Sequence, residues 1–219
     1  MSMNIEQARV NMVENQVRPV EVTDPRVLEV LGSVRREDFV PARYRALAFA
    51  DMMLPIGHGE TMLKPIVEGR LLQGLDLDGS ERVLEIGTGS GFLTACLARL
   101  AADVTSLEIH PDLAEMARAQ IAGAGIRNAR IEVADGLAGY RAATPFDVVV
   151  LGGAMYALTD AVRELVAPGG RLFAFVGASP VIEARLYRRA DAGRWLQEGL
   201  FETDVAYLRN AGPPRRFTL

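Results

Sequence analysis

The spacing of apolar residues divides the chain into two parts. Up to about residue 75, apolar residues recur at helical intervals, and prolines stand where helices commonly begin. These signals are the spacing of Ile5, Ala8 and Met12, the pair Asp24-Pro25, and the apolar run after Pro65. We therefore expect an N-terminal segment of helices and one loop over residues 1–75, packed on a core domain over residues 76–219.

The core segment alternates short apolar strands with helices. Strands are predicted at 82–86, 104–109, 129–134, 146–151 and 171–176, and helices at 92–100 and 111–124. Strands that are apolar on both faces and separated by helices form parallel sheets covered on both sides. The tail differs, because residues 186–189 and 195–207 flank a turn at 191–193 and so predict antiparallel strands. The expected fold class is α/β, a Rossmann-like, doubly wound and mostly parallel sheet with antiparallel strands at its C-terminal edge.

Composition and charge narrow the functional classes. A length of 219 residues suits one domain with an extension, and a net charge of −4 disfavours a nucleic-acid partner held by phosphate contacts. The single cysteine, Cys96, excludes an intramolecular disulfide, and two distant histidines predict no metal site. We find no membrane-spanning run and no signal-peptide pattern, so we expect a cytoplasmic protein with no membrane partner.

A glycine-rich loop follows the first strand of the core segment. Glu85 is followed by the glycines of a G-x-G-x-G pattern, at positions 87, 89 and 91, and a predicted helix begins directly afterwards. Glycines permit a tight turn and let a ligand approach the backbone, where the helix N-terminus offers free N–H groups. The pattern differs from the G-x-G-x-x-G of dinucleotide enzymes and by itself indicates only a nucleotide site.

Two acidic residues follow the next two strands. Glu108 ends the second strand, where a carboxylate can accept hydrogen bonds from ribose hydroxyls. Asp135-Gly136 follows the third strand, where a carboxylate could accept a hydrogen bond from an adenine amino group. A turn signal at 168–170 precedes the fifth strand. Together with the glycine loop, these features predict a nucleoside site along one edge of the sheet.

This ordered set resembles the class I S-adenosylmethionine-dependent methyltransferases. The resemblance implies S-adenosylmethionine as cofactor and S-adenosylhomocysteine as product. It places Glu85 and Gly87 near the methionine portion, Glu108 on the ribose and Asp135 near adenine. The full set of implied cofactor residues is Glu85, Gly87, Thr88, Gly89, Gly91, Glu108, Ile109, Asp135 and Gly136. A nicotinamide-binding or purely structural Rossmann unit is the alternative, which the agreement of four features in order and spacing disfavours.

Further segments narrow the resemblance to one family. They are residues 36–41, Tyr44, residues 54–61, residues 135–140 and the closing Pro214-Arg215-Arg216-Phe217. These segments resemble the protein-L-isoaspartate O-methyltransferases. The resemblance implies methylation of the α-carboxylate of L-isoaspartyl residues, whose ester collapses to a succinimide that can reopen as aspartate. The implied partners are therefore isoaspartyl-containing proteins or peptides, and the implied process is protein repair.

The acceptor segment departs from the pattern of that family. The family carries Thr-x-Ser-x-Pro, whereas this chain keeps Thr61 and Pro65 but has Leu63 at the serine position. Loss of an oriented hydroxyl donor commonly costs on the order of 10²-fold in rate. Either Lys64 or Thr61 orients the acceptor instead, or the pocket takes a small-molecule hydroxyl, thiol or amine. A catalytically silent protein that only binds the cofactor is a further alternative.

Single residues complete the set of candidates. The catalytic candidates are Thr61, the position of Leu63, and His58, which acts either as a base or in shaping the loop. His110 is expected to begin a helix and flank the adenosine. Cys96 is expected to be a small buried residue rather than a nucleophile.

Overall fold

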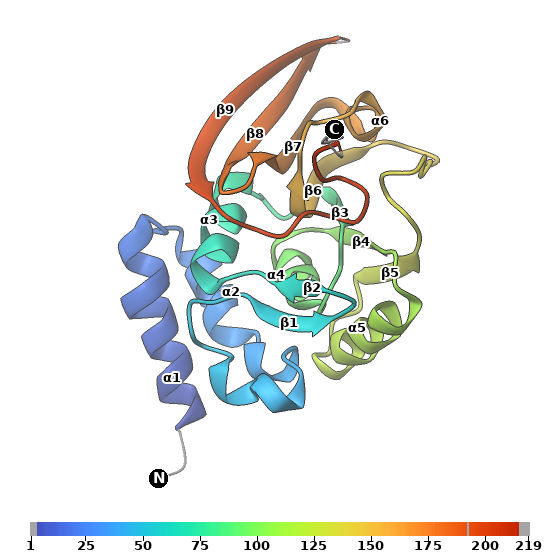
Figure 1. The fold of residues 1–219 in the computed structure, drawn as a ribbon. Coiled ribbons are helices and arrows are strands. Elements are labelled where there is room, and N and C mark those ends of the chain that lie inside the picture. The colour runs from blue at the N-terminus through green and yellow to red at the C-terminus, as the bar shows by residue number, and fades with distance from the viewer. Residues whose placement is uncertain (1–3, 192, 215–219) are drawn as a thin grey trace, which may run out of the picture.

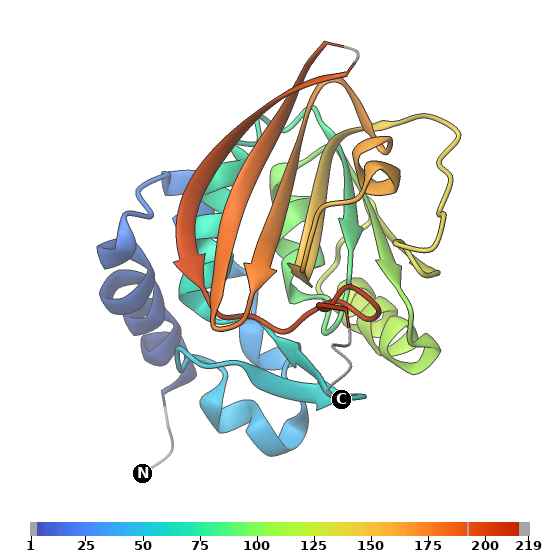
Figure 2. The ribbon, with the colours of Figure 1, turned by 45° about the horizontal axis from the view of Figure 1, so that its top comes forward.

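The computed structural model describes residues 4–191 and 193–214, and its centre is a sheet of seven strands (Figures 1 and 2). The strands are β3 (Arg82–Ile86), β4 (Asp103–Glu108), β5 (Ala129–Val133), β6 (Phe146–Met155), β7 (Val166–Ala178), β8 (Val181–Asp191) and β9 (Arg194–Thr203). Their order is β5-β4-β3-β6-β7-β8-β9. Pairings from β5 to β7 are parallel, and those of β8 with β7 and β9 are antiparallel. The predicted sheet with an antiparallel C-terminal edge is confirmed.

Apolar residues on both faces explain why the central strands of the sheet are buried. Val148 and Val150 of β6 belong to one hydrophobic cluster, and Val149 between them belongs to a second cluster. Because successive side chains of a strand point to opposite faces, each face has its own core. The first cluster is completed by α2 (Pro25–Ser33), α3 (Pro65–Leu75), α4 (Phe92–Leu100) and α5 (Pro111–Gly123), and the second by α6 (Asp160–Arg163).

The N-terminal segment is helical at its start. It comprises α1 (Ile5–Met12), one turn of π-helix (Val13–Val17), a 3₁₀ turn (Arg18–Val20), α2, and two further 3₁₀ segments (Arg36–Asp38 and Ala42–Leu47). The predicted start of α2 is confirmed, since the side chain of Asp24 accepts a hydrogen bond from the backbone N–H of Arg26. A proline at the first helical position lacks only an N–H that would have no partner there.

The expectation of only helices and a loop in residues 1–75 was wrong at one place. Residues 54–62 form a hairpin of β1 (Leu54–Gly57) and β2 (Glu60–Met62). The turn between them holds Gly57, His58 and Gly59 at positive φ, a conformation that glycine adopts without strain and that ends any helix. Figure 2 shows this hairpin near the carboxyl ends of the central strands, with the C-terminal segment between them.

Several strand boundaries also differ from the prediction: β6 continues to Met155 and β8 begins at Val181, and larger differences occur in β7 and β9. The predicted turn at 168–170 is an irregularity inside β7, where the pairing moves from Phe146↔Val166 to Val148↔Arg171. A Cβ at Gly170 would lie 2.6 Å from the carbonyl oxygen of Asp147, so only glycine fits there. The last strand ends at Thr203 rather than at residue 207, and the chain then returns across the sheet edge.

Three further findings complete the fold. Arg215, Arg216 and Phe217, which contributed to the family resemblance, lie outside the described residues. Within the described ranges, no helix has the length and apolar character needed to cross a bilayer. The same residues contain no group of three or more metal-ligating side chains.

Candidate active site

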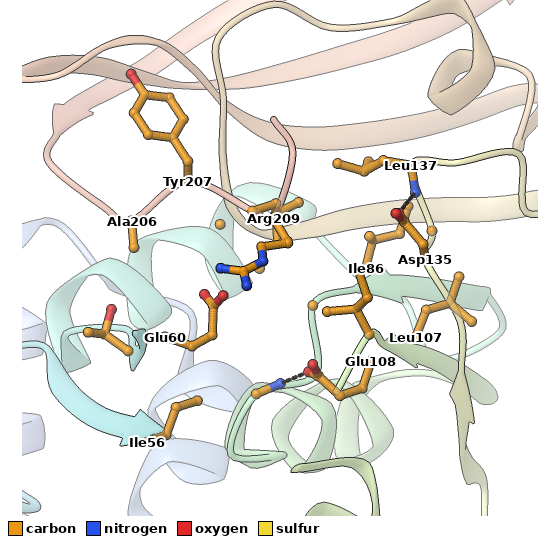
Figure 3. A pocket seen from close by; sticks show the side chains of 18 of the residues that line it. Ile56, Glu60, Ile86, Leu107, Glu108, Asp135, Leu137, Ala206, Tyr207 and Arg209 are labelled. Atoms are coloured by element: carbon orange, nitrogen blue, oxygen red, sulfur yellow. Dashed lines mark hydrogen bonds between the residues drawn. The ribbon is translucent and has the colours of Figure 1, made fainter. Parts of the chain in front are cut away.

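A pocket opens where the carboxyl ends of β3, β4 and β6 meet (Figure 3). Ligands of open α/β sheets bind at this reversal of strand order. The lining residues come from the β1–β2 hairpin, the strand ends and the C-terminal segment: Ile56, Glu60, Thr61, Leu63, Ile86, Gly87, Gly89, Leu107, Glu108, Ile109, residues 134–137, Gly152, Gly153 and residues 206–209. The pocket therefore joins segments that are far apart in the sequence.

The glycine loop forms the floor of the pocket. The backbone N–H of Gly87 donates to the carbonyl of Leu107 at 2.8 Å, which ties the loop to the end of β4. Gly87 has φ of 95°, and a Cβ there would lie 2.7 Å from Leu208. A Cβ at Gly152 would lie 2.5 Å from the carbonyl oxygen of Gly87. Gly152 therefore allows the backbone of β6 to approach the loop closely, and Gly87 holds a positive φ beside the side chain of Leu208.

Glu108 is the best-oriented acidic group of the pocket. Its side chain is only 4% exposed, and its two oxygens accept the backbone N–H groups of Gly89 at 2.8 Å and His110 at 3.0 Å. A carboxylate oxygen has two lone pairs, so each oxygen retains one acceptor site. The loop and the start of α5 therefore hold this carboxylate in place while leaving it able to bind two hydroxyl groups.

Asp135 is oriented by the turn that follows β5. One of its oxygens, Oδ1, accepts the backbone N–H groups of Leu137 at 2.9 Å and Ala138 at 3.2 Å. Figure 3 shows the carboxyl group on the side of the pocket opposite Glu60. Ile86, Leu107 and Leu137 add apolar surface to the same side, which suits a flat aromatic base.

Glu85 lies behind the pocket rather than on its surface. The side chain is fully buried, and Oε2 accepts hydrogen bonds from the hydroxyls of Thr94 at 2.5 Å and Ser106 at 2.6 Å. Ser106 also bonds to Thr88 of the glycine loop at 2.5 Å. Burial raises the pKa of Glu85 to about 7, against the opposing effect of the hydroxyl donors. Glu85 and Thr88 thus support the loop from below.

The remaining predicted cofactor residues also fall into two groups, those that line the pocket and one that lies behind it. Gly89, Ile109 and Gly136 line the pocket. Gly91 instead begins α4 with φ of 83°, and a Cβ there would lie 3.0 Å from Ala117. Gly91 therefore allows close packing of the loop against α5.

The acceptor side is built by the β1–β2 hairpin and the residues after it. Thr61 and Leu63 both line the pocket, and Leu63 is 6% exposed. The hydroxyl of Thr61 lies 3.8 Å from the sulfur of Met53, which is a weak acceptor. Thr61 and Leu63 therefore form part of the pocket wall on the hairpin side.

Arg36 fixes this segment to the core. Its guanidinium is fully buried and donates to the carbonyls of Ala48 at 2.8 Å and Leu63 at 2.7 Å, and to the carboxylate of Glu68. Its carbon also lies 4.6 Å from the ring centroid of Phe92. One buried cation thus joins the acceptor segment, α3 and α4.

The two histidines stack on each other at the rim. The ring centroids of His58 and His110 are 4.1 Å apart and nearly parallel, with an angle of 11° between the rings. His58 Nε2 lies 2.8 Å from Asp112, and this hydrogen bond holds the pKa of the Asp112 carboxyl below its usual value. His58 is not among the residues that line the pocket, whereas Glu60, 3.6 Å from His110, is. The stack connects the hairpin turn to the start of α5.

The sequence did not reveal the contribution of the C-terminal segment. Residues 206–209 line the pocket because the N–H of Ala154 donates to the carbonyl of Ala206 at 2.8 Å, and that of Leu208 to the carbonyl of Ala154 at 2.9 Å. Gly152 and Gly153 lie in an irregular stretch of β6 beside them. These residues match no local motif, so only the folded arrangement identifies them.

The prediction that Cys96 is a buried residue is confirmed.

Comparison with known proteins decides the family. A family model, Protein-L-isoaspartate(D-aspartate) O-methyltransferase (PCMT), matches residues 7–209. The chain belongs to this family. A protein-L-isoaspartate O-methyltransferase 1 of Anaeromyxobacter sp. (strain Fw109-5) is 45% identical over 178 residues, covering 81% of this chain and 83% of the relative. A protein-L-isoaspartate O-methyltransferase of Methylorubrum populi is 41% identical over 170 residues, covering 78% and 80% respectively.

Solved structures of the protein-L-isoaspartate O-methyltransferase family share the fold. A crystal structure from Plasmodium falciparum, described as such an enzyme in complex with S-adenosyl-L-homocysteine, superposes with a TM-score of 0.80. It is 19% identical and covers 95% of this chain and 99% of its own. A second structure with the family's name gives a TM-score of 0.78 at 22% identity, covering 93% and 67%. At these identities the likeness establishes the class I methyltransferase fold.

Proposed function

We propose that this protein transfers the methyl group of S-adenosylmethionine to the α-carboxylate of L-isoaspartyl residues in proteins or peptides. Family membership supports the reaction. The observation that carries the proposal is one pocket in which the oriented carboxylate of Glu108 faces the Thr61 hairpin. Residues 76–219 supply the strand ends and the C-terminal segment, and residues 1–75 supply the hairpin, so both parts of the chain contribute to one site.

The residues of the pocket fit this cofactor. Glu108 retains an acceptor site on each oxygen for the two ribose hydroxyls. The turn after β5 donates its hydrogen bonds to Oδ1 of Asp135, and we assign the other oxygen, Oδ2, to the adenine amino group. Gly87 and Gly152 leave backbone exposed where the methionine portion would lie. Glu85, Thr88 and Gly91 are assigned to support of the loop rather than to direct contact.

The chemistry requires alignment more than proton transfer. S-adenosylmethionine supplies a methyl group on a positively charged sulfur. The acceptor carboxylate is ionised at neutral pH, so the protein needs no general base, and we assign His58 to positioning of the hairpin. The chain must hold the acceptor oxygen in line with the methyl–sulfur bond, and rigid support of the acceptor segment by Arg36 serves this purpose.

The experiment is label transfer from methyl-labelled S-adenosylmethionine. An L-isoaspartyl peptide should become labelled, and its aspartyl twin of the same sequence should not. If a compound in a metabolite extract became labelled and neither peptide did, the protein would instead be a methyltransferase of a small molecule, the alternative raised by Leu63. Binding of the cofactor with no labelled product in any sample would identify a silent binding protein. We also propose a cytoplasmic location for this activity, where the single buried thiol of Cys96 would remain reduced.

A further inference from the structure

The acceptor side of the pocket has little to hold a carboxylate. Leu63 offers no hydrogen-bond donor, and the hydroxyl of Thr61 is directed toward the sulfur of Met53. Glu60, which also lines the pocket, carries a negative charge that repels an anionic acceptor. A carboxylate bound here needs a positive group within the pocket.

Arg209 supplies that group. Among the described residues that line the pocket it is the only one with a cationic side chain. Figure 3 shows its guanidinium pointing into the pocket toward the carboxylate of Glu60. Within the described part of the chain, Arg209 makes no hydrogen bond or ion pair, so its five N–H donors are available to a ligand.

The backbone around Arg209 is fixed although its side chain is exposed. Leu208 donates to Ala154, the N–H of Ala211 donates to the carbonyl of Leu208 at 3.0 Å, and Asn210 closes the turn with φ of 66°. The hydroxyl of Tyr207 donates to the carbonyl of Gly177 at 3.0 Å. The guanidinium therefore extends into the pocket from an anchored base.

We propose that Arg209 binds the acceptor carboxylate, taking the orienting role for which Leu63 has no hydroxyl. A guanidinium matches a carboxylate with two parallel hydrogen bonds, which fixes the orientation of the acceptor as well as its charge. The pocket is thereby selective for anionic acceptors, and Glu60 competes with the substrate for Arg209. This inference rests on the proposed carboxyl methylation.

The reaction itself predicts which kinetic constant changes. A carboxylate oxygen attacks the methyl carbon, the carbon–sulfur bond breaks with its electron pair remaining on sulfur, and a neutral ester and a neutral thioether result. The negative charge on the acceptor decreases toward the transition state, so an ion pair with Arg209 stabilises bound substrate more than the transition state. Loss of Arg209 should therefore raise KM for the peptide without lowering kcat, which should stay the same or rise.

The test compares Arg209→Gln with Arg127→Gln. Arg127 is exposed, lies outside the pocket and gives the same change in net charge. Arg209→Gln should raise the peptide KM by roughly 10- to 100-fold, as expected for a lost hydrogen bond to a charged group, whereas Arg127→Gln should not. The peptide KM of Arg209→Lys should lie between those of the wild type and Arg209→Gln, because lysine retains the charge but not the paired N–H donors. Glu60→Gln should lower the KM.

Equilibrium binding separates this inference from the proposed function. The peptide is titrated into protein saturated with S-adenosylhomocysteine, and affinity for S-adenosylhomocysteine itself is measured in parallel. Peptide binding that weakens in Arg209→Gln, with unchanged S-adenosylhomocysteine affinity, supports the role of Arg209 even if turnover is absent. A wild-type protein that methylates the peptide while Arg209→Gln keeps wild-type KM and peptide affinity overturns the inference alone. Absence of peptide binding to the wild-type complex overturns both.

Discussion

Replacing Glu108 by glutamine removes the charge that we assign to the ribose while keeping the volume of the side chain. In the structure each carboxylate oxygen accepts one backbone N–H, from Gly89 at 2.8 Å and from His110 at 3.0 Å. Glutamine has one carbonyl oxygen, so its amide nitrogen must face one of these two donors. The substitution therefore affects the unliganded loop as well as the bound cofactor.

The effect on the unliganded loop is measured by the melting temperature, and the effect on the bound cofactor by the affinity for S-adenosylhomocysteine. An unsatisfied buried N–H costs about 1–3 kcal/mol, which should lower the melting temperature of a domain of this size by several degrees. On binding, the variant also loses one charge-assisted hydrogen bond to the ribose, worth about 1.5–3 kcal/mol. This corresponds to an affinity for S-adenosylhomocysteine that is weaker by roughly 10- to 150-fold.

The assay is calorimetric titration of S-adenosylhomocysteine into Glu108→Gln, with thermal unfolding of the same samples. Glu115→Gln is the matched control, because Glu115 is an exposed residue of α5 outside the pocket. The control should bind as the wild type does. If Glu108→Gln also bound with wild-type affinity, the carboxylate would have no part in holding the ribose and the assignment would be refuted.

Three further predictions concern the acceptor segment and the buried charges. Leu63→Ser should exceed Leu63→Ala in kcat/KM for an isoaspartyl peptide by on the order of 10²-fold, since both leave the same cavity and only serine adds a donor; equal rates would contradict a role for the hydroxyl. Arg36→Met should reduce the free energy of unfolding by about 3–5 kcal/mol in urea titrations, because Glu68 remains buried without its partner; a change below about 1 kcal/mol would refute this. Burial raises the pKa of Glu85 from 4.5 to about 7, so the native state keeps this proton to a higher pH than the unfolded chain does. The resulting contribution to the free energy of unfolding is fully present below about pH 4.5 and is lost as the pH rises through 7. Glu85→Gln should therefore gain stability relative to wild type between pH 5 and pH 8, by up to about 3 kcal/mol, and a difference independent of pH would contradict the shift.

The parallel core was predictable because its signals are local. The glycine loop follows the mostly apolar β3 and Glu108 ends the buried β4, whereas Asp135 follows β5, an edge strand in which apolar residues alternate with charged ones. Since the carboxyl ends of parallel strands lie at one edge, the topology alone brings these residues together. The sequence therefore predicted most of the donor side of the pocket.

The remainder depends on contacts between distant segments. Residues 54–62 lie among helices and gave no clear strand signal, and their hairpin is held by Arg36 through a bond to the carbonyl of Leu63. Arg209 reaches the pocket only because Leu208 and its neighbours pair with Ala154 of β6. Likewise, spacing could not show that Glu85 is buried and accepts hydrogen bonds from Thr94 and Ser106. Each of these outcomes is set by tertiary packing.

The most direct test of the account is to follow an L-isoaspartyl peptide by mass spectrometry in the presence of wild-type protein and S-adenosylmethionine. The account predicts a methyl ester on the α-carboxylate of the isoaspartyl residue, formed together with S-adenosylhomocysteine, then a succinimide and an aspartyl peptide. The aspartyl twin should remain unmodified throughout. An isoaspartyl peptide that stays unchanged while the protein binds S-adenosylmethionine would contradict the proposed function.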